Sequence, residues 1–133
     1  LICDPIIRDS LINKMRSLIF STALPPISMA WSNFIFNKVL TMQAQRQHLA
    51  DISQYLQQAI VDKGFASPSS SHIIPIIVGE SQAAVEKARE VQAQGFYIMP
   101  MRPPTVPQHS SRLRISLTAL IQKSELEQLV RCL

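Results

Sequence analysis

A chain of 133 residues, 47% of them hydrophobic and 17% charged, has the length and apolar content of one folded domain, which excludes a disordered, highly charged protein. Thirteen basic and nine acidic side chains give a net charge of +4. The basic residues are scattered from Arg8 to Arg131 without forming a run, so neither a nucleic-acid-binding patch nor a membrane-surface patch is indicated.

The apolar runs and the cysteines bear on the location of the protein. No apolar stretch reaches the roughly 18 residues that a membrane-spanning helix needs, and the first residues lack the layout of a signal peptide. Cys3 and Cys132 have neither the spacing of a metal motif nor that of a disulfide framework. This usage is typical of the reducing cytoplasm, where we expect the protein. A start at Leu1 rather than at methionine suggests a piece of a longer protein.

The N-terminal region is predicted to hold a helix followed by an extended link. Asp4 is a suitable cap for a helix that begins at Pro5. Apolar residues then recur at spacings of four and three, which predicts one helix to about residue 18: Ile7, Leu11, Met15 and Leu18. Residues 19–24 have no helical period and precede Pro25, so they are expected to be extended.

Residues 26–63 are predicted to form a long connecting helix, either as one helix or as two stacked end to end. The first part carries an apolar face with helical spacing: Ile27, Ala30, Trp31, Phe34, Ile35 and Val39. The polar run 43–48 interrupts this face without a proline or glycine, and the face then resumes at Leu49, Ile52, Leu56 and Ile60. Gly64 is a natural C-terminal stop, and residues 66–71 form a loop by composition.

Residues 72–133 are predicted to form a small β-α-β-β-α domain. The expected elements, in chain order, are a strand at 73–78, a helix at 82–94, strands at 96–101 and 112–118, and a helix behind a capping box of Ser124 and Glu127. Pro75 removes one donor of the strand ladder, which favours an edge strand or a bulge.

This order of elements predicts an α+β fold, in which helices cover a small, mostly antiparallel sheet. The long connecting helix precedes the sheet in the chain. We therefore divide the sequence into residues 1–63, which contain the first helix, the link and the connecting helix, and residues 72–133, the small domain. Together the two parts are expected to form one structural unit.

The common catalytic signatures are missing from the sequence. Glycine is confined to junctions between elements, so there is no phosphate-binding loop. The histidines have no metal-ligand spacing and are interpreted as solvated: His48, His72 and His109. The lysines fall on helices or helix ends and are interpreted as solvated rather than as Schiff-base nucleophiles: Lys14, Lys38, Lys63, Lys87 and Lys123. We expect no catalytic residue and no metal site in this chain.

The most informative segment is Met101-Arg-Pro-Pro-Thr-Val-Pro107, which is followed by Arg112-Leu-Arg-Ile-Ser-Leu-Thr118. A loop stiffened by prolines places Thr105 between Arg102 and Arg114 in the sequence. Arginine suits a fixed, bidentate contact with a carboxylate, and a rigid frame reduces the entropy lost on binding. The residues alone leave two interpretations open. They indicate either a carboxylate-binding site or an edge strand whose arginines form its solvated face and deter aggregation.

These motifs resemble the C-terminal portion of the α-oxoamine synthases, enzymes that depend on pyridoxal 5′-phosphate and share the fold type I aminotransferase-like architecture. A second match, Leu18-Ile-Phe-Ser-Thr-Ala-Leu-Pro-Pro26, is similar to the family segment downstream of the cofactor lysine. The resemblance covers essentially the whole chain. The doubled proline after Arg102 is typical of the biotin-pathway branch of the family rather than of its sister branches.

The resemblance implies roles for five residues. Arg114 matches the arginine that binds the carboxylate of the amino-acid substrate. Thr105 matches a substrate-contacting threonine, and Arg102 matches a loop arginine near the acyl substrate. Ser21 and Thr22 match hydroxyls near the cofactor phosphate, and Thr22 is expected to reach the site of the neighbouring subunit.

For the biotin-pathway branch, the resemblance implies decarboxylative condensation of L-alanine with a pimeloyl thioester. The cofactor lysine of the family, with the histidine and aspartate that contact the cofactor ring, matches no residue of this chain, so the chain by itself is expected to be inactive. A homodimer is expected because the apolar face over 27–35 would otherwise stay exposed.

Two alternatives remain beside this hypothesis. One is another branch of the family, which makes 5-aminolevulinate or 2-amino-3-oxobutyrate. The other is a stand-alone α+β module that binds a small carboxylic acid. A preceding segment with a lysine-bearing cofactor motif would distinguish an enzyme from such a module.

Overall fold

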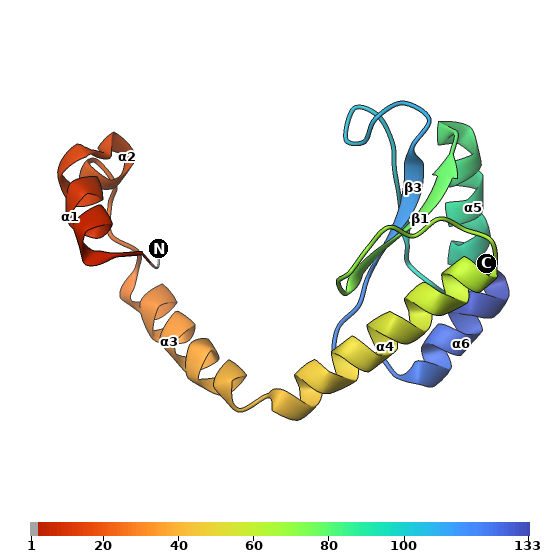
Figure 1. Cartoon of the computed structure of the whole chain (residues 1–133), viewed down its shortest axis with the longest axis horizontal. Helices are drawn as coiled ribbons and strands as arrows, with labels where there is room; N and C mark the ends of the chain where they lie inside the picture. Colours follow the sequence, from red (N-terminus) through yellow and green to blue (C-terminus); the bar gives the residue numbers. More distant parts are fainter. Residues whose placement is uncertain (1–2) are drawn as a thin grey trace. The chain divides into compact units, whose positions relative to one another are not determined.

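The computed structural model describes residues 3–133 (Figure 1). Its elements in chain order are α1 (Pro5–Lys14), α2 (Arg16–Ile19), α3 (Pro26–Leu40), α4 (Gln43–Asp62), β1 (Ile73–Gly79), α5 (Ser81–Ala93), β2 (Met99–Met101), β3 (Ser111–Ser116) and α6 (Lys123–Cys132). They form two compact units, Leu1–Thr41 and Met42–Leu133.

The boundary between the units differs from the expected division after residue 63. It falls between α3 and α4, because the apolar face of α4 is buried in the same core as the sheet, through Ile52, Leu56 and Ile60. The chain therefore changes from one unit to the other at Thr41, inside the segment that was predicted to be the connecting helix.

Helices α1 and α2 replace the single N-terminal helix that the periodicity predicts. The Asp4 carboxylate accepts a hydrogen bond from the backbone N–H of Ile6 at 2.9 Å, which caps α1 as expected. At Met15 the backbone is extended, with φ −83° and ψ 102°, and a short second helix begins at Arg16. The apolar spacing continues across this break, so the sequence pattern does not reveal it.

The segment predicted to be the connecting helix consists of two separate helices, α3 and α4, rather than one. Helix α3 ends at Leu40, and the Thr41 hydroxyl donates to the backbone carbonyl of Lys38 at 2.8 Å. No residue of α3 is buried. Its large apolar side chains are therefore exposed, with Ile27 at 75% and Trp31 at 62% of their accessible surface.

The sheet has the order β1-β3-β2, and both pairs of neighbouring strands are antiparallel. In the first pair Ile74 faces Ile115, and in the second pair Pro100 faces Leu113. Pro75 lies in the edge strand β1, as predicted. Strand β2 is shorter than expected, because only residues 99–101 pair with β3.

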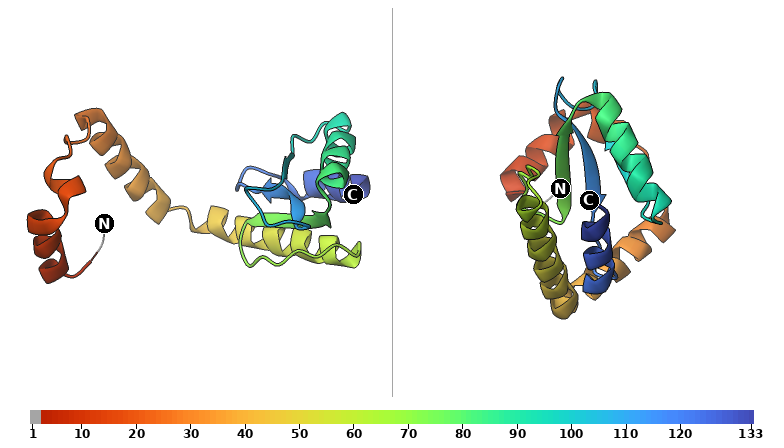
Figure 2. Two further views of the ribbon diagram at one scale, coloured as in Figure 1. Left: turned by 90° about the horizontal axis from the view of Figure 1, so that it is seen from above. Right: turned by 90° about the vertical axis from the view of Figure 1, so that its right-hand side faces the viewer.

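Helices α4 and α5 contact the sheet, and α6 contacts both of these helices (Figure 2). The core lies between them and one face of the sheet. Its buried side chains come from every element of this unit except β2: Ile52, Leu56, Ile60, Ile74, Ile76, Ala88, Val91, Ile98, Leu113, Ile115, Leu117, Leu126 and Leu129. The predicted α+β class is confirmed.

The start of α6 corrects one prediction. The capping box does not involve Ser124 and Glu127, because α6 begins at Lys123 and Ser124 already lies inside the helix. Gln122 is the N-cap, with extended backbone angles, and its backbone N–H donates to the Glu125 carboxylate at 2.8 Å. The box therefore lies two residues earlier than the sequence pattern indicates.

No helix within residues 3–133 is both long and apolar enough to cross a membrane. The two cysteines, Cys3 and Cys132, are free thiols.

Candidate carboxylate-binding site

The side of the sheet that faces away from the helices carries the predicted site. Because side chains alternate between the two faces of a strand, Leu113 and Ile115 enter the core, whereas Arg112 and Arg114 lie on the other side. We call this side the open face, and we define it by Ile73, Pro75, Ile77, Met99, Met101, Arg112, Arg114 and Ser116.

Arg114 stands in the middle of the open face. It pairs in register with Pro75 of β1 on one side and with Met99 of β2 on the other, and its side chain is exposed. Both register partners are apolar and offer no side-chain acceptor to its guanidinium. Such a guanidinium is suited to a bidentate contact with a carboxylate.

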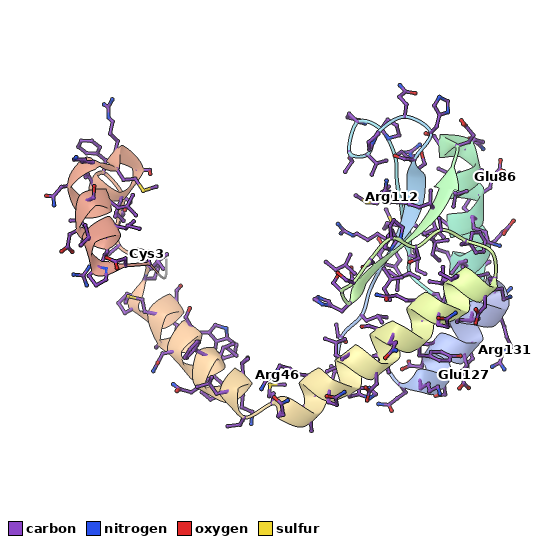
Figure 3. All side chains as sticks on the ribbon, in the orientation of Figure 1. Cys3, Arg46, Glu86, Arg112, Glu127 and Arg131 are labelled. Atoms are coloured by element: carbon purple, nitrogen blue, oxygen red, sulfur yellow. The ribbon has the colours of Figure 1, made fainter. Side chains whose placement is uncertain are left out.

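Arg112 has different surroundings from Arg114, although both are on the same face. It lies between Ile77 and Met101 in register and is half-buried (Figure 3). Its Nε donates to the backbone carbonyl of Ser110 at 2.9 Å. One of its donors is therefore used within the protein, which fixes the direction of the side chain.

A groove of about 330 Å³ lies on the open face and includes both arginines. Two loops form its walls. The serine-rich loop before β1 forms one wall, and the loop between β2 and β3, residues 102–110, forms the other. The lining residues are Pro68, Ser69, Ser71, Ile73, Pro75, Met101, Val106, Arg112 and Arg114.

The other two residues predicted on the 102–110 loop do not line this groove. Arg102 and Thr105 are both exposed, and the backbone N–H of Thr105 donates to the carbonyl of Arg102 at 3.0 Å, which closes a turn. The Pro103–Pro104 peptide bond within the turn is cis. Val106, the next residue, is the loop side chain that reaches the groove.

Ser21 and Thr22 belong to the unit Leu1–Thr41, separate from the groove. They lie in the segment 21–25, which has no regular secondary structure. The extended link was predicted to begin at residue 19, but Ile19 is the last residue of α2 and Phe20 is its C-cap, with φ −100° and ψ 13°. The Ser21 hydroxyl donates to the backbone carbonyl of Leu18 at 3.0 Å, so its proton is already used. Thr22 is exposed.

The serine-rich loop is a part of the site that sequence reasoning missed. Ser69 and Ser71 line the groove opposite Val106, and the Ser69 hydroxyl donates to the backbone carbonyl of Ile73 at 2.7 Å. A run of serines is typical of any loop. This loop differs from an ordinary one only because it folds back onto the open face, where it lines the groove. The sequence contains no signal for that return.

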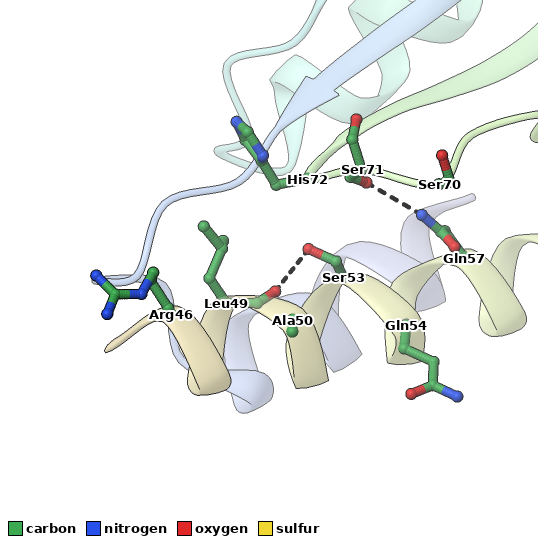
Figure 4. Close-up of a pocket in the computed structure, with 9 residues that line it drawn as sticks. All are labelled: Arg46, Leu49, Ala50, Ser53, Gln54, Gln57, Ser70, Ser71 and His72. Carbon is green, nitrogen blue, oxygen red and sulfur yellow. Dashed lines mark hydrogen bonds between the residues drawn. The ribbon is translucent and has the colours of Figure 1, made fainter. Parts of the chain in front are cut away.

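A second groove, of about 400 Å³, lies between α4 and residues 70–72 (Figure 4). Gln57 bridges it by donating to the backbone carbonyl of Ser71 at 3.0 Å. The side chains of Arg46, Gln54 and His72 point away from one another (Figure 4). These polar groups do not converge on a common point, so this groove is not a candidate site.

The histidines and lysines agree in part with the prediction that they are solvated. His72 and His109 are exposed, but His48 is half-buried, and its Nε2 lies 2.9 Å from the backbone carbonyl of Ile121. None of the five lysines is buried, and the half-buried Lys87 forms an ion pair with Glu90 at 3.2 Å. Within residues 3–133, no three metal-ligating side chains gather at one place.

Comparison with known proteins places these features in a family. The whole chain, residues 1–133, matches the sequence profile described as aminotransferase class I and II. The chain belongs to the aminotransferase class I and II family. A member of the α-oxoamine synthase group within this family was expected from the two motifs, and the relatives agree with that expectation.

Two relatives of this family member are named for one reaction. A protein of Pasteurella multocida (strain Pm70), provisionally named 8-amino-7-oxononanoate synthase, is 53% identical over 133 residues, which are 99% of this chain and 34% of the relative. The 8-amino-7-oxononanoate synthase of Haemophilus ducreyi is 49% identical over 134 residues, covering 100% of this chain and 35% of the relative. The chain thus spans about a third of the length of these relatives.

Solved structures share the fold of this aminotransferase-family chain. Serine palmitoyltransferase of Sphingomonas wittichii superposes with a TM-score of 0.87 at 26% identity, over 98% of this chain and 34% of that one. The 8-amino-7-oxononanoate synthase of Francisella tularensis gives a TM-score of 0.83 at 20% identity, over 97% and 38%. A serine palmitoyltransferase with pyridoxal phosphate bound as internal aldimine gives 0.86 at 20% identity, over 98% and 35%.

Proposed function

We propose that the complete protein containing these residues is an 8-amino-7-oxononanoate synthase. It condenses L-alanine with a pimeloyl thioester, releases carbon dioxide and the free thiol, and gives 8-amino-7-oxononanoate for biotin synthesis. The observation that carries this proposal is the identity of 53% with a relative named for this reaction, which extends over the whole chain without interruption by another kind of domain.

The groove on the open face supports the choice of substrates. The exposed guanidinium of Arg114 is the binding group for the carboxylate of alanine, because its donors point out of the sheet between two apolar residues. The apolar walls from Pro75, Met101 and Val106 suit an aliphatic acyl chain beside that carboxylate. Holding both substrates in one place raises their effective concentration at the reacting atoms.

Thr105 and Arg102 are proposed as further substrate contacts. Both are exposed on the turn that precedes Val106, where an incoming acyl thioester meets their side chains before it reaches the groove. A threonine hydroxyl and a guanidinium both donate to the oxygen atoms of such a substrate.

Pyridoxal 5′-phosphate is the proposed cofactor, and the residues of this chain fit one part of it. The exposed hydroxyl of Thr22 suits a phosphate oxygen, and Ser21 suits it once its hydroxyl leaves the Leu18 carbonyl. When bound, the cofactor supplies an electron sink for the carbanion. No lysine of this chain is buried, so we place the lysine that holds the cofactor outside residues 1–133.

A cytoplasmic homodimer is the proposed assembly. The free thiols Cys3 and Cys132 agree with a reducing compartment. The exposed apolar side chains of α3 provide a surface that a second subunit or the remainder of the protein would cover.

The test is a direct assay of the complete protein. It is purified with pyridoxal phosphate and incubated with L-alanine and either pimeloyl-CoA or a pimeloyl carrier protein, and the product is identified by mass spectrometry. We expect 8-amino-7-oxononanoate with alanine and no comparable product with glycine or serine. Preferential use of glycine or serine with another acyl thioester would assign the protein to a sister branch, and binding of a carboxylic acid without turnover would favour a binding module.

A further inference from the structure

The loop 102–110 is held at its C-terminal end by a contact between two side chains that the proposed reaction does not explain. The Nδ1 atom of His109 lies 2.7 Å from the Oε1 atom of Glu80. His109 has φ 57°, a left-handed backbone conformation that is uncommon for residues other than glycine. The backbone thus turns at His109 in the way that directs its ring towards the start of α5.

Glu80 is available for this contact because of its place in the fold. It immediately precedes α5, but its side chain makes no capping hydrogen bond to that helix. A carboxylate at a helix N-terminus is favoured by the helix dipole. The partner of this carboxylate is the imidazole of His109, which is 29 residues away in the sequence.

The neighbouring residues anchor the same corner. Gly79 pairs with Ser111, next to an irregularity in the β1–β3 ladder, and the hydroxyl groups of Ser81 and Ser111 lie 3.2 Å apart. Ser111 is completely buried. The buried Ser111 therefore fixes the end of the loop to the core. The Glu80–His109 pair adds a second attachment, which involves the exposed part of the loop.

Two hydrogen bonds of Ser110, the residue after His109, connect the Glu80–His109 contact to the groove. The Ser110 hydroxyl donates to the backbone carbonyl of Pro107 at 2.7 Å, and Pro107 follows the groove residue Val106. The backbone carbonyl of Ser110 in turn accepts from Nε of Arg112 at 2.9 Å. The position of residues 109 and 110 thus influences one wall of the groove and the half-buried arginine on its floor.

We propose that His109 is a positioning residue, whose hydrogen bond with Glu80 holds the 102–110 loop in place and so sets the affinity of the groove for the acyl substrate. This inference rests on the proposed synthase function. Both side chains are exposed, at 77% and 71%. Even an ion pair with such exposure changes an equilibrium by at most about fivefold, which sets the size of the expected effect.

Substitutions can remove the contact between His109 and Glu80 without preventing the backbone turn at residue 109. Glycine adopts a positive φ without strain, so His109→Gly removes the imidazole and leaves the backbone turn possible. Asparagine also tolerates this conformation, and its side-chain amide can donate from nearly the place of Nδ1, so His109→Asn is the conservative variant. Glu90→Ala is the control, because it removes a different exposed carboxylate, which pairs with the half-buried Lys87 inside α5 and not with the loop.

Steady-state kinetics of the complete protein provides the first test. His109→Gly and Glu80→Ala are each expected to raise the KM for the pimeloyl thioester about two- to fivefold, and the double variant no further. The KM for alanine and kcat stay unchanged, His109→Asn restores most of the affinity, and Glu90→Ala behaves as the wild type. Additive effects, an unchanged thioester KM, or an equal rise in both KM values would overturn the proposal.

Hydrogen exchange provides a second test that does not depend on turnover. The backbone N–H groups of Thr105 and Ser110 are bonded within the loop at 3.0 and 3.3 Å. In Glu80→Ala, which leaves the loop sequence intact, they are expected to exchange about two- to fivefold faster than in Glu90→Ala. Equal exchange in the two variants would refute the positioning role. A wild-type protein that exchanges as expected but does not condense alanine would refute the synthase function alone.

Discussion

Arg114 and Arg112 are two residues apart in β3 and share the open face, yet their surroundings differ. Arg114 is exposed between Pro75 and Met99, and Arg112 is half-buried and donates to the Ser110 carbonyl. The first guanidinium is available to a ligand, whereas the second supports the loop. Because β3 is the central strand of the sheet, its arginines do not protect an exposed edge, as the second interpretation of the sequence required.

Replacing Arg114 with alanine tests its role in the complete enzyme. Loss of a charge-assisted, bidentate contact costs about 2–4 kcal/mol, so kcat/KM for alanine is expected to fall roughly 30- to 1000-fold. Arg114→Lys recovers only part of this loss, because a point charge cannot reproduce the planar fork. The KM for the thioester changes little by comparison. Steady-state kinetics with each substrate varied in turn provides the measurement.

Arg112→Ala is the internal control for this prediction. Its effect on alanine is expected to be smaller, because it acts through the Ser110 carbonyl rather than on the substrate. Equal, mild losses in both variants, with an unchanged affinity for alanine, would mean that the two arginines are only the solvated face of the strand.

The lysines give a second prediction at the residue scale. None of the five is buried, and a lysine needs a dry pocket to act as a nucleophile at neutral pH. The chain 1–133 mixed with pyridoxal phosphate is therefore expected to show no specific covalent attachment to a lysine. A saturating one-to-one absorbance change, mapped by reduction and peptide mass spectrometry to one of these lysines, would contradict this expectation.

At the scale of elements, the start of α6 offers a paired test of helix capping. Glu125 accepts the backbone N–H of Gln122 at 2.8 Å, whereas Glu127 is an exposed carboxylate one turn into the helix. Glu125→Ala is expected to lower the free energy of unfolding by about 0.5–2 kcal/mol. Glu127→Ala should change it by less than about 0.5 kcal/mol. Urea denaturation of both variants decides between the capping box of Gln122 and Glu125 and the box of Ser124 and Glu127 that the sequence pattern indicates.

The elements also show where sequence reasoning succeeds and where it stops. Alternation in residues 112–118 predicts β3 and its two faces, because one face of that strand is buried and the other is not. The pattern over 96–101 predicts a strand of similar length, but only 99–101 pair. The backbone carbonyl of Ile98 instead accepts from the Gln92 side chain at 2.8 Å, and the N–H of Phe96 donates to Val91. These partners come from α5, and the local sequence does not specify them.

In the candidate site, too, some features follow from the local sequence and others only from the fold. The sequence leaves a carboxylate site and a solvated strand face open for Arg102, Thr105 and Arg114, and only Arg114 of the three lines the groove. The serine wall of the groove and the Glu80–His109 pair depend on segments far apart in the chain that meet only after folding. His109 in particular looks like any solvated histidine of a loop until its partner is known.

At the scale of the whole molecule, the apolar surface of α3 governs assembly. The rings of Trp31 and Phe34 pack against each other with centroids 5.7 Å apart, and both side chains remain more than half exposed. The chain by itself is expected to form a dimer or a larger species through this helix. Sedimentation velocity measures the size, and Trp31, the single tryptophan of the chain, reports burial by a blue shift of its fluorescence. A monomer at high concentration would contradict this prediction.

A matched pair of variants assigns the association to α3. Phe34→Ser removes an apolar side chain from this surface and is expected to shift the equilibrium towards monomer. Val61→Ser removes an exposed apolar side chain from α4, in the other unit, and should leave the equilibrium unchanged.

The uneven burial of the two units has a consequence for calorimetry. Every core residue lies in Met42–Leu133, and no residue among 3–41 is buried. Unfolding enthalpy follows the surface that becomes hydrated, at about 0.7 kcal/mol per residue near 60 °C. The monomeric chain should therefore absorb about 65 kcal/mol on melting, the heat of its second unit, rather than the about 93 kcal/mol of an evenly packed protein of its length. Deleting residues 1–41 would then remove nearly a third of the mass and leave the heat-capacity peak almost unchanged.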